Sequence, residues 1–196
     1  IKMKPENAIT FQIFKDLSLT EKERIRIEHT FEQLNLKKGE LLLKANDIVD
    51  HQYYVGDGCL RTFFIDRDAK EHTLQFAIKD WWISDYTSYF TNTKSILSIE
   101  CIQHATIYKI SKENIESLYL EIPKLETFFR KKLEGAFASF QKRILSSLSQ
   151  SAKERYASFT QTYPNIEQQV KNYHIASYLG ITTESLSRIR KEIAQK

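Results

Sequence analysis

Apolar residues recur at helical spacing near the start of the chain, and the pattern then changes to that of strands. From Thr20 to about Leu34 the spacing predicts a helix, begun by a capping box between Thr20 and Glu23. Short runs rich in β-branched and aromatic residues follow: ELLLKA, QYYVG, CLRTFFI, HTLQFAI, ILSIECIQ and ATIYKI. They predict antiparallel strands in a roll, barrel or sandwich that ends near Ile110. The turns expected between them lie at Gly39, Asn46-Asp47, Gly56-Asp57-Gly58, Asp66 to Asp68 and Lys94-Ser95.

The spacing returns to a helical period after the predicted strands. Ser111 is placed to cap a short helix over KENIESLYLEI, and Pro123 suits the first turn of a longer one that runs to about Leu148. A helix of that length measures on the order of 40 Å and needs a partner for its apolar stripe. That partner is either its own β domain or the same helix of a second subunit. The residues expected at such a dimer interface are Leu125, Phe129, Leu133, Phe137, Phe140 and Ile144.

The last part of the chain is expected to be nearly all helical. Residues 151–174 indicate two helices broken at Pro164, and YHIASYLGITTESLSRIRKEI over residues 173–193 predicts two short helices that meet at a tight turn. Gly180 can adopt the left-handed conformation that ends a helix, and Thr182 suits the N-cap of the next. The side chains expected to face inward are Ile175, Tyr178, Leu179, Leu186, Ile189 and Ile193. This is the pattern of a helix-turn-helix, whose second helix enters the major groove of DNA.

Polar and charged side chains remain for the outer face of the second helix. Arg188 can donate two hydrogen bonds to a guanine, Glu184 can accept from a cytosine amino group, and Ser187 can bond a base or a phosphate. An alternative interpretation is that Glu184 and Arg188, at positions i and i+4, form an ordinary surface ion pair. The residues expected to contact DNA are Thr182, Thr183, Glu184, Ser187, Arg188 and Lys191, with phosphate contacts also from Lys171, Tyr173 and Arg190.

The net charge of +4 is unevenly distributed along the chain. Residues 1–123 carry 16 Lys and Arg against 19 Asp and Glu, a balance of −3. Residues 124–196 carry 13 against 6, a balance of +7. A basic C-terminal third joined to a neutral or acidic part is typical of a nucleic-acid-binding segment attached to a sensor or scaffold, although a solvated basic helix face gives the same count.

Other function classes lack the residues that they would need. Cys59 and Cys101 are isolated thiols and the five His are scattered, so we expect no metal, iron–sulfur or haem site. The same scatter argues against the metal triad of a β-roll enzyme, and no catalytic role is expected. No run of 18 or more apolar residues occurs, and the N-terminal segment lacks the apolar core of a signal peptide. A cytoplasmic location without a membrane partner is therefore expected.

The stretch IASYLGITTESLSRIRKEI resembles the helix-turn-helix of the cyclic-AMP receptor protein/FNR (Crp/Fnr) family of bacterial transcription regulators, and LKKGELLL and YYVGDGCLRTFF are similar to the family's strand and turn pattern. Within the predicted recognition helix, Glu184 and Arg188 match positions that contact base edges in the family. The resemblance covers nearly the whole chain and implies an α+β fold. Its parts would be a double-stranded β-roll sensor domain, like a cyclic-nucleotide-binding jelly roll, over residues 1–122, a dimerisation helix over 123–149 and a helix-turn-helix DNA-binding domain over 150–196.

The resemblance also locates a candidate ligand pocket, where this chain departs from the family. Members that bind cyclic nucleotides carry Gly-Glu for the ribose and, further along, Arg-Ser for the cyclic phosphate, whereas Ser84-Asp85 and Ser95-Ile96 stand near those places here. No Arg occurs from residue 68 to residue 129. A buried phosphate requires a positive partner, so we expect no cyclic AMP binding and no cofactor, with any other effector unknown. The candidate pocket residues are Trp82, Ser84, Asp85, Tyr86 and Ser95.

Together these features predict a homodimeric, sequence-specific transcription regulator. Two recognition helices related by the dimer twofold would enter successive major grooves about 34 Å apart and read a palindromic operator. In the family, a ligand bound at the β-roll shifts the long helix and rotates the DNA-binding domains, and here such modulation would come from a compound other than cyclic AMP. Double-stranded DNA and a second subunit are the expected partners, with RNA polymerase as a further candidate. The alternative is a ligand-sensing or protein-interaction module that has lost specific DNA binding.

Overall fold

The computed structural model describes residues 9–195, so residues 1–8 and 196 of the predicted first and last domains lie outside the described part. Two short helices come first, α1 (Ile9–Ile13) and α2 (Glu21–Glu28). Thr20 begins α2 with the predicted capping box, in which its side chain and the Glu23 side chain each accept from the other's backbone N–H. The predicted extension of this helix to Leu34 was wrong. Residues 32–36 form strand β1 (Glu32–Leu36) because pairing with β6 outweighs the local helical spacing.

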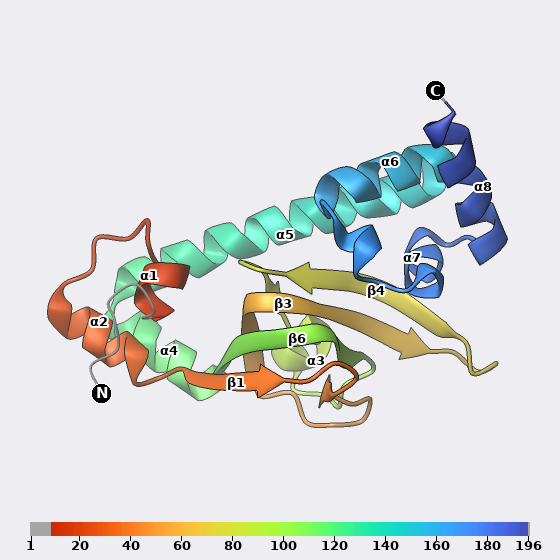
Figure 1. Ribbon diagram of the computed structural model, residues 1–196. Helices are drawn as coiled ribbons and strands as arrows, with labels where there is room; N and C mark the ends of the chain where they lie inside the picture. Colours follow the sequence, from red (N-terminus) through yellow and green to blue (C-terminus); the bar gives the residue numbers. More distant parts are fainter. Residues whose placement is uncertain (1–8, 196) are drawn as a thin grey trace.

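The centre of the molecule is an antiparallel sheet of six strands within the described residues. Its path runs β1, β6, β3, β4 (Figure 1), and β2 pairs with β6 and β5 with β3. Val55, Leu60 and Ile99 are fully buried and belong to one core inside the sheet. The remaining elements of this part are β2 (Leu41–Leu43), β3 (His51–Ile65), β4 (Glu71–Ile78), β5 (Trp82–Ile83), α3 (Tyr86–Thr91) and β6 (Ser98–Ser111).

One predicted turn lies inside a long strand. Gly56, Asp57 and Gly58 belong to β3, where the register against β6 shifts on both sides of Asp57, so these residues form bulges. Gly58 has a φ of +91°, and a Cβ there would lie 2.3 Å from the carbonyl oxygen of His104, so this close approach of two strands requires glycine. ILSIECIQ, from Ser98 onward, and ATIYKI likewise lie in the single strand β6. The runs were correctly predicted as strands, but their separation into four strands was wrong.

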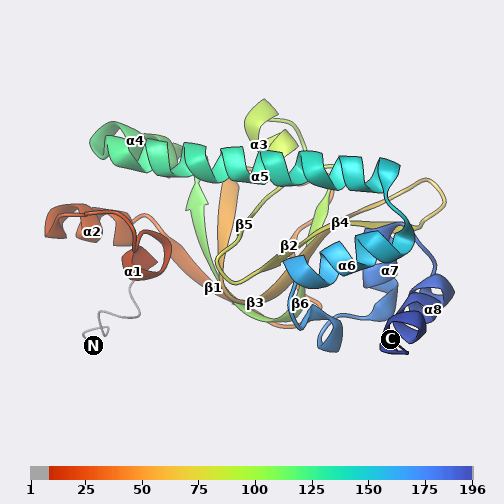
Figure 2. The same cartoon turned by 90° about the horizontal axis from the view of Figure 1, so that it is seen from above.

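Helices α4 (Lys112–Glu121) and α5 (Pro123–Ser149) follow the sheet close to their predicted bounds. Ser111 caps α4 as predicted, and Pro123 occupies the first turn of α5. With its 27 residues α5 extends across the molecule, from α4 at one end to α6 at the other (Figures 1 and 2). Every residue from Arg130 to Lys142 is exposed, so the middle of α5 does not pack on its own sheet.

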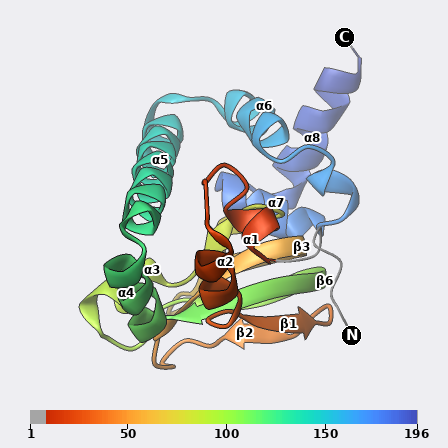
Figure 3. The same ribbon diagram turned by 90° about the vertical axis from the view of Figure 1, so that its left-hand side faces the viewer.

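The rest of the described chain is helical. Ser151 and Glu154 form a capping box at the start of α6. After Pro164 the chain forms only a short 3₁₀ turn instead of the predicted second helix. Figures 1 and 3 show α7 beside β4, which lies at one edge of the sheet. The fold is thus mixed α and β, as expected. Its C-terminal elements are α6 (Ala152–Thr162), η2 (Ile166–Gln168), α7 (Asn172–Leu179) and α8 (Thr183–Ala194).

Candidate nucleic-acid interface

The turn between α7 and α8 has the geometry of the predicted helix-turn-helix. Gly180 ends α7 in the left-handed conformation, with φ 67° and ψ 36°. The N–H of Ile181 then donates to the carbonyl oxygen of Ala176 at 3.0 Å, which closes the end of α7. The Thr182 side chain accepts from the N–H of Ser185 and caps α8. Local hydrogen bonds therefore cap both the end of α7 and the start of α8.

Apolar side chains on the facing sides of α7 and α8 hold the pair together. Ile175 and Leu179 of α7 and Leu186 and Ile189 of α8 are buried in one core with side chains of α6. Ile193, also predicted to be buried, is 40% exposed because it lies in the last turn of α8, past the residues that pack on this core. The predicted packing is confirmed except for that last turn.

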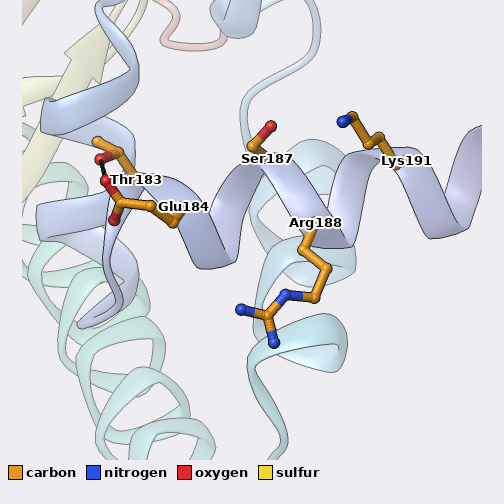
Figure 4. A pocket seen from close by; sticks show the side chains of 5 residues that line it. All are labelled: Thr183, Glu184, Ser187, Arg188 and Lys191. Carbon is orange, nitrogen blue, oxygen red and sulfur yellow. Dashed lines mark hydrogen bonds between the residues drawn. The ribbon is translucent and has the colours of Figure 1, made fainter.

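One face of α8 carries the polar residues predicted to contact bases. Figure 4 shows Thr183, Ser187 and Lys191 along one row of the helix and Glu184 and Arg188 along the neighbouring row. All five are exposed and line a shallow, open depression. Neither Arg188 nor Lys191 has an ion-pair partner among the described residues. Two cations near each other on one helix are thus free to meet an anion.

The ion pair considered for Glu184 and Arg188 is not formed. The Glu184 carboxylate accepts from the Thr183 hydroxyl at 3.1 Å, and the Glu184 side chain extends toward Thr183, away from Arg188 (Figure 4). Hydrogen bonds from the backbone N–H of Glu184 itself and from the side chains of Thr182 and Thr183 lower the pKa of the Glu184 carboxyl, so it is ionised at neutral pH. Both charged groups remain available to a partner.

Arg190, predicted to contact phosphate, is held within the helical bundle instead. Its Nε donates to the Glu167 carboxylate at 3.0 Å, and its Nη1 donates to the side-chain oxygen of Asn172 at 2.7 Å. The guanidinium thus connects α8 to η2 and α7, and its charge is already paired. Lys171 and Tyr173 are exposed at the start of α7, with the Lys171 ammonium 5.6 Å from the centre of the Tyr173 ring.

Two residues that the sequence did not single out anchor α7 to the rest of the molecule. The Ser177 hydroxyl donates to the carbonyl oxygen of Glu71 and accepts from the N–H of Thr73, both at 2.9 Å. Arg143 of α5 donates to the carbonyl oxygens of Thr73 and Tyr178 at 3.4 and 3.3 Å and lies 3.9 Å over the Tyr178 ring. The helix-turn-helix is thereby held to both β4 and α5. No local pattern marks these contacts, because the partners of Ser177 lie 104 and 106 positions away.

The predicted dimer residues of α5 fall into two groups. Leu125 is fully buried near α4, and the Phe129 ring lies 4.9 Å from that of Trp82. These two residues serve the core of their own chain, contrary to the prediction. Leu145 and Leu148, 63% and 79% exposed, lengthen the apolar surface beyond the predicted interface residues. The other four predicted residues are between 38% and 63% exposed: Leu133, Phe137, Phe140 and Ile144.

The candidate ligand pocket contains a buried carboxylate that already accepts several hydrogen bonds. Asp85 is fully buried and caps α3 by accepting from the N–H of Ser88. It also accepts from the Ser95 hydroxyl at 2.9 Å and from the N–H groups of Ile96 and Leu97 at 3.0 and 3.3 Å. Burial by itself raises the pKa of Asp85, but hydrogen bonds, chiefly from Ser88, Ser95 and Ile96, outweigh it and lower the pKa. An ionised side chain of the protein therefore occupies this group of donors.

The other predicted pocket residues do not contact this carboxylate. Ser84 is buried and donates to a backbone carbonyl oxygen of β3. Trp82 packs against aromatic rings that include one from α5, and Tyr86 stacks on a ring of its own helix α3. Of the five residues, only Asp85 and Ser95 are joined by a hydrogen bond.

Known proteins share both the sequence pattern and the arrangement of these elements. Residues 33–121 match the cyclic nucleotide-binding domain family. The chain is 21% identical to the anaerobic regulatory protein of Haemophilus influenzae, over 91% of this chain and 73% of that protein. It is 21% identical to the fumarate and nitrate reduction regulatory protein of Yersinia pestis, over 91% of this chain and 75% of that protein.

Solved structures give the same result for the fold. FixK2 from Bradyrhizobium japonicum is similar with a TM-score of 0.72 at 15% identity, over 84% of this chain and 85% of that one. A transcriptional regulator of the crp/fnr family from Eubacterium rectale gives 0.70 at 19% identity, over 95% and 88% of the two chains. In sequence pattern and in fold the chain is therefore similar to Crp/Fnr transcription regulators. The predicted resemblance and the fold class are thus confirmed. The relatives named above are regulatory proteins.

Two further findings concern metals and membranes. Within residues 9–195, no group of three or more His, Cys, Asp or Glu is placed to hold a metal ion. Cys59 and Cys101 are buried, and burial raises the pKa of their thiols to about 12 and about 11. None of the described helices has the length and apolar character needed to cross a membrane.

Proposed function

We propose that this protein is a sequence-specific DNA-binding transcription regulator of the Crp/Fnr type. The observation that carries the proposal is the unpaired polar face of α8, on the second helix of a fully formed helix-turn-helix. Arg188 can form two hydrogen bonds with a guanine, Glu184 can accept from a cytosine amino group, and Lys191 can approach phosphates. Lys171 and Tyr173 at the start of α7 would add phosphate contacts. The names of the relatives, which are regulatory proteins, support the same activity.

The proposed active form is a homodimer that pairs through α5. Residues 130–142 of α5 are all exposed, and an exposed apolar row runs from Leu133 to Leu148 along this helix, which favours pairing with a second copy. The twofold axis would then place two α8 helices about 34 Å apart, in successive major grooves of a palindromic operator. In this arrangement residues 1–122 form the sensor part, residues 123–149 the dimer helix and residues 150–196 the DNA-binding part.

The surroundings of Asp85 support DNA binding that does not require cyclic AMP. A cyclic phosphate placed among Ser88, Ser95 and Ile96 would meet an ionised carboxylate, and the sequence from residue 68 to residue 129 contains no Arg to compensate. Two anions would share one buried set of donors at a large electrostatic cost. Any effector acting through the β-roll would then be a different compound. RNA polymerase is a further proposed partner.

Selection of bound duplexes from a random library by the purified chain, without added ligand, tests the function. We expect enrichment of a palindrome with half-sites one helical turn apart. The double variant Arg188→Ala/Lys191→Ala should abolish enrichment, because it removes the two free cations of α8. Lys15→Ala/Lys22→Ala removes the same charge around α1 and α2, at the opposite end of the molecule from α8 (Figure 1), and should leave it unchanged.

Two outcomes would contradict the proposal. Enrichment of one motif by both double variants would show that α8 is not the reading helix. An unenriched library with the unmodified chain would favour a protein-interaction module that has lost specific DNA binding.

A further inference from the structure

A small cavity lies where the helix-turn-helix meets the sheet, apart from the α8 face and from Asp85. Its volume is about 100 Å³. Lys38, in the turn between β1 and β2, and Glu100 of β6 line it from the sheet. Lys171 and His174 line it from the start of α7. Two parts of the chain that are far apart in sequence therefore share its walls.

His174, which lines this cavity, has a buried polar atom without a partner among the described residues. Its side chain belongs to a residue that is only 3% exposed, and its Nδ1 is buried without a hydrogen-bond partner among the described residues. Burial, together with the positive charges of Arg61 and Lys171, lowers the pKa of His174 to about 3, so the ring is neutral at pH 7. A neutral imidazole can carry its proton on Nδ1 and donate it. A buried donor that the protein leaves unpaired indicates a place where a ligand atom can bind.

The charges around His174 favour an anionic ligand. Lys38 has no ion-pair partner among the described residues, and Lys171 contacts only an aromatic ring. The carboxylate of Glu100 is already bound, at 2.8 Å, by the guanidinium of the buried Arg61. Lys171 is also the N-cap of α7 and makes no side-chain cap hydrogen bond. The positive end of the α7 dipole therefore has no side-chain acceptor near Lys171 and His174, the two residues that line the cavity from this end of α7.

We propose that this cavity binds a small oxyanion with the chemistry of phosphate. Its oxygen atoms would accept hydrogen bonds from the Lys171 ammonium and from Nδ1–H of His174, near the positive end of the α7 dipole. Pockets for drug-sized ligands measure about 300–1,000 Å³, so a cavity of about 100 Å³ suits one phosphate group and excludes a nucleotide. Lys38 provides a further positive charge from the sheet side.

A bound anion would connect the helix-turn-helix to the sheet part of the molecule. It would interact with Lys171 and His174 on one side and with Lys38 on the other. It would hold α7 on the sheet beside the Ser177 hydrogen bonds to β4 and so favour one orientation of α8. This regulatory consequence rests on the proposed function. The binding itself involves no DNA and is measured without it.

Isothermal titration calorimetry of the full chain with inorganic phosphate, at pH 7 and constant ionic strength, tests the site. We expect one saturable site per chain. Lys171→Gln should weaken it by about tenfold, the loss that one charge-assisted hydrogen bond implies. Lys22→Gln removes an equal charge from α2 and should leave the affinity unchanged. No saturable heat with the unmodified chain, or equal weakening in the two variants, would overturn the proposal.

Adenosine monophosphate in the same titration distinguishes a free oxyanion from a phosphate ester. We expect it not to compete with inorganic phosphate, because the nucleoside does not fit the volume. Competition with equal or higher affinity would contradict the assignment to a small free anion.

The ring of His174 gives a second measurement that needs no variant. By nitrogen NMR we expect the Nδ1 resonance of His174 to shift on saturation with phosphate, and the pKa of the ring to rise because a nearby negative charge stabilises its protonated form. The other histidines should not respond. An unresponsive His174 would count against the anion site, whereas phosphate saturation without DNA binding would count against the proposed function alone.

Discussion

The Ser177 hydroxyl on α7 accepts a hydrogen bond from the backbone N–H of Thr73 on β4 at 2.9 Å. The same hydroxyl donates to the carbonyl oxygen of Glu71, which lies two residues before Thr73 on the same strand. The edge strand of a sheet presents unpaired N–H and C=O groups, and here a single side chain of the helix-turn-helix satisfies one of each. The helix pair that is proposed to bind DNA is thereby tied to the sheet that would carry an effector.

Replacing Ser177 by Ala should loosen this connection. The change leaves one backbone donor and one acceptor without their partner, and we expect the free energy of unfolding to fall by about 1–2 kcal/mol. Ser187→Ala, on the exposed face of α8, should change it by no more than about 0.5 kcal/mol. Urea denaturation of the two variants measures both values. Equal effects, or no effect of Ser177→Ala, would show that the hydroxyl does not hold the two parts together.

Charge placed in the exposed row of α5 should separate the subunits. Phe137 is 63% exposed, so Phe137→Asp should leave the fold of each chain intact while making burial against a second α5 costly. Ser139 is exposed on the other side of the same helix, and Ser139→Asp introduces the same charge there. Sedimentation velocity should show a dimer for the unmodified chain and for Ser139→Asp, and a monomer for Phe137→Asp. A monomer in all three cases would contradict pairing through α5.

Features that depend on neighbouring residues were predicted correctly from the sequence. The capping box at Thr20, the left-handed Gly180, the N-cap Thr182 and the long helix after Pro123 each depend on a few residues in one segment. Their physical causes are local, since a cap or a positive φ restricts only the adjacent backbone. The exposed polar face of α8 was predicted for the same reason, because it is the side of one helix that carries no apolar residues.

Features that depend on distant partners could not be predicted. Arg188 and Arg190 lie two positions apart on α8, yet only Arg190 meets a carboxylate, because Glu167 of another segment packs against that side of the helix. Nothing near Ser177 in sequence announces its contact with β4. The glycines around Gly58 suggested a turn because sequence alone does not show that a neighbouring strand passes so close.

Asp85→Asn should destabilise the β part even though it preserves the shape of the side chain. The Asp85 carboxylate accepts from N–H and hydroxyl groups of Ser88, from the Ser95 hydroxyl and from two backbone N–H groups before β6. An amide would turn an NH₂ group toward some of these donors, at a cost of about 2–3 kcal/mol. Asp57→Asn, at an exposed position, is the matched control. Urea denaturation at pH 7 should show the loss only for Asp85.

The same carboxyl should contribute to acid sensitivity. Its pKa is lowered in the folded protein from an ordinary value of 3.8, so the unfolded chain binds the proton more readily. The stability it contributes is therefore present above about pH 4 and is lost as the pH falls through the folded pKa. The difference in the free energy of unfolding between the unmodified chain and Asp85→Asn should therefore be smaller at pH 3 than at pH 5. Parallel losses in both would show that Asp85 does not contribute to the acid response.

His174 should make the protein less stable in mildly acidic solution, at pH values where carboxyl groups do not yet titrate. Its pKa falls from an ordinary 6.5 to about 3 on folding, so the unfolded chain takes up a proton that the folded chain excludes, and stability rises with pH between those values. Acidification from pH 7 to pH 5.5 should therefore cost about 1 kcal/mol through this residue. His174→Gln should remove that loss, whereas His104→Gln, at an exposed position, should retain it. If the loss persists in His174→Gln, another group causes it. The pKa of His174 would then not be lowered on folding.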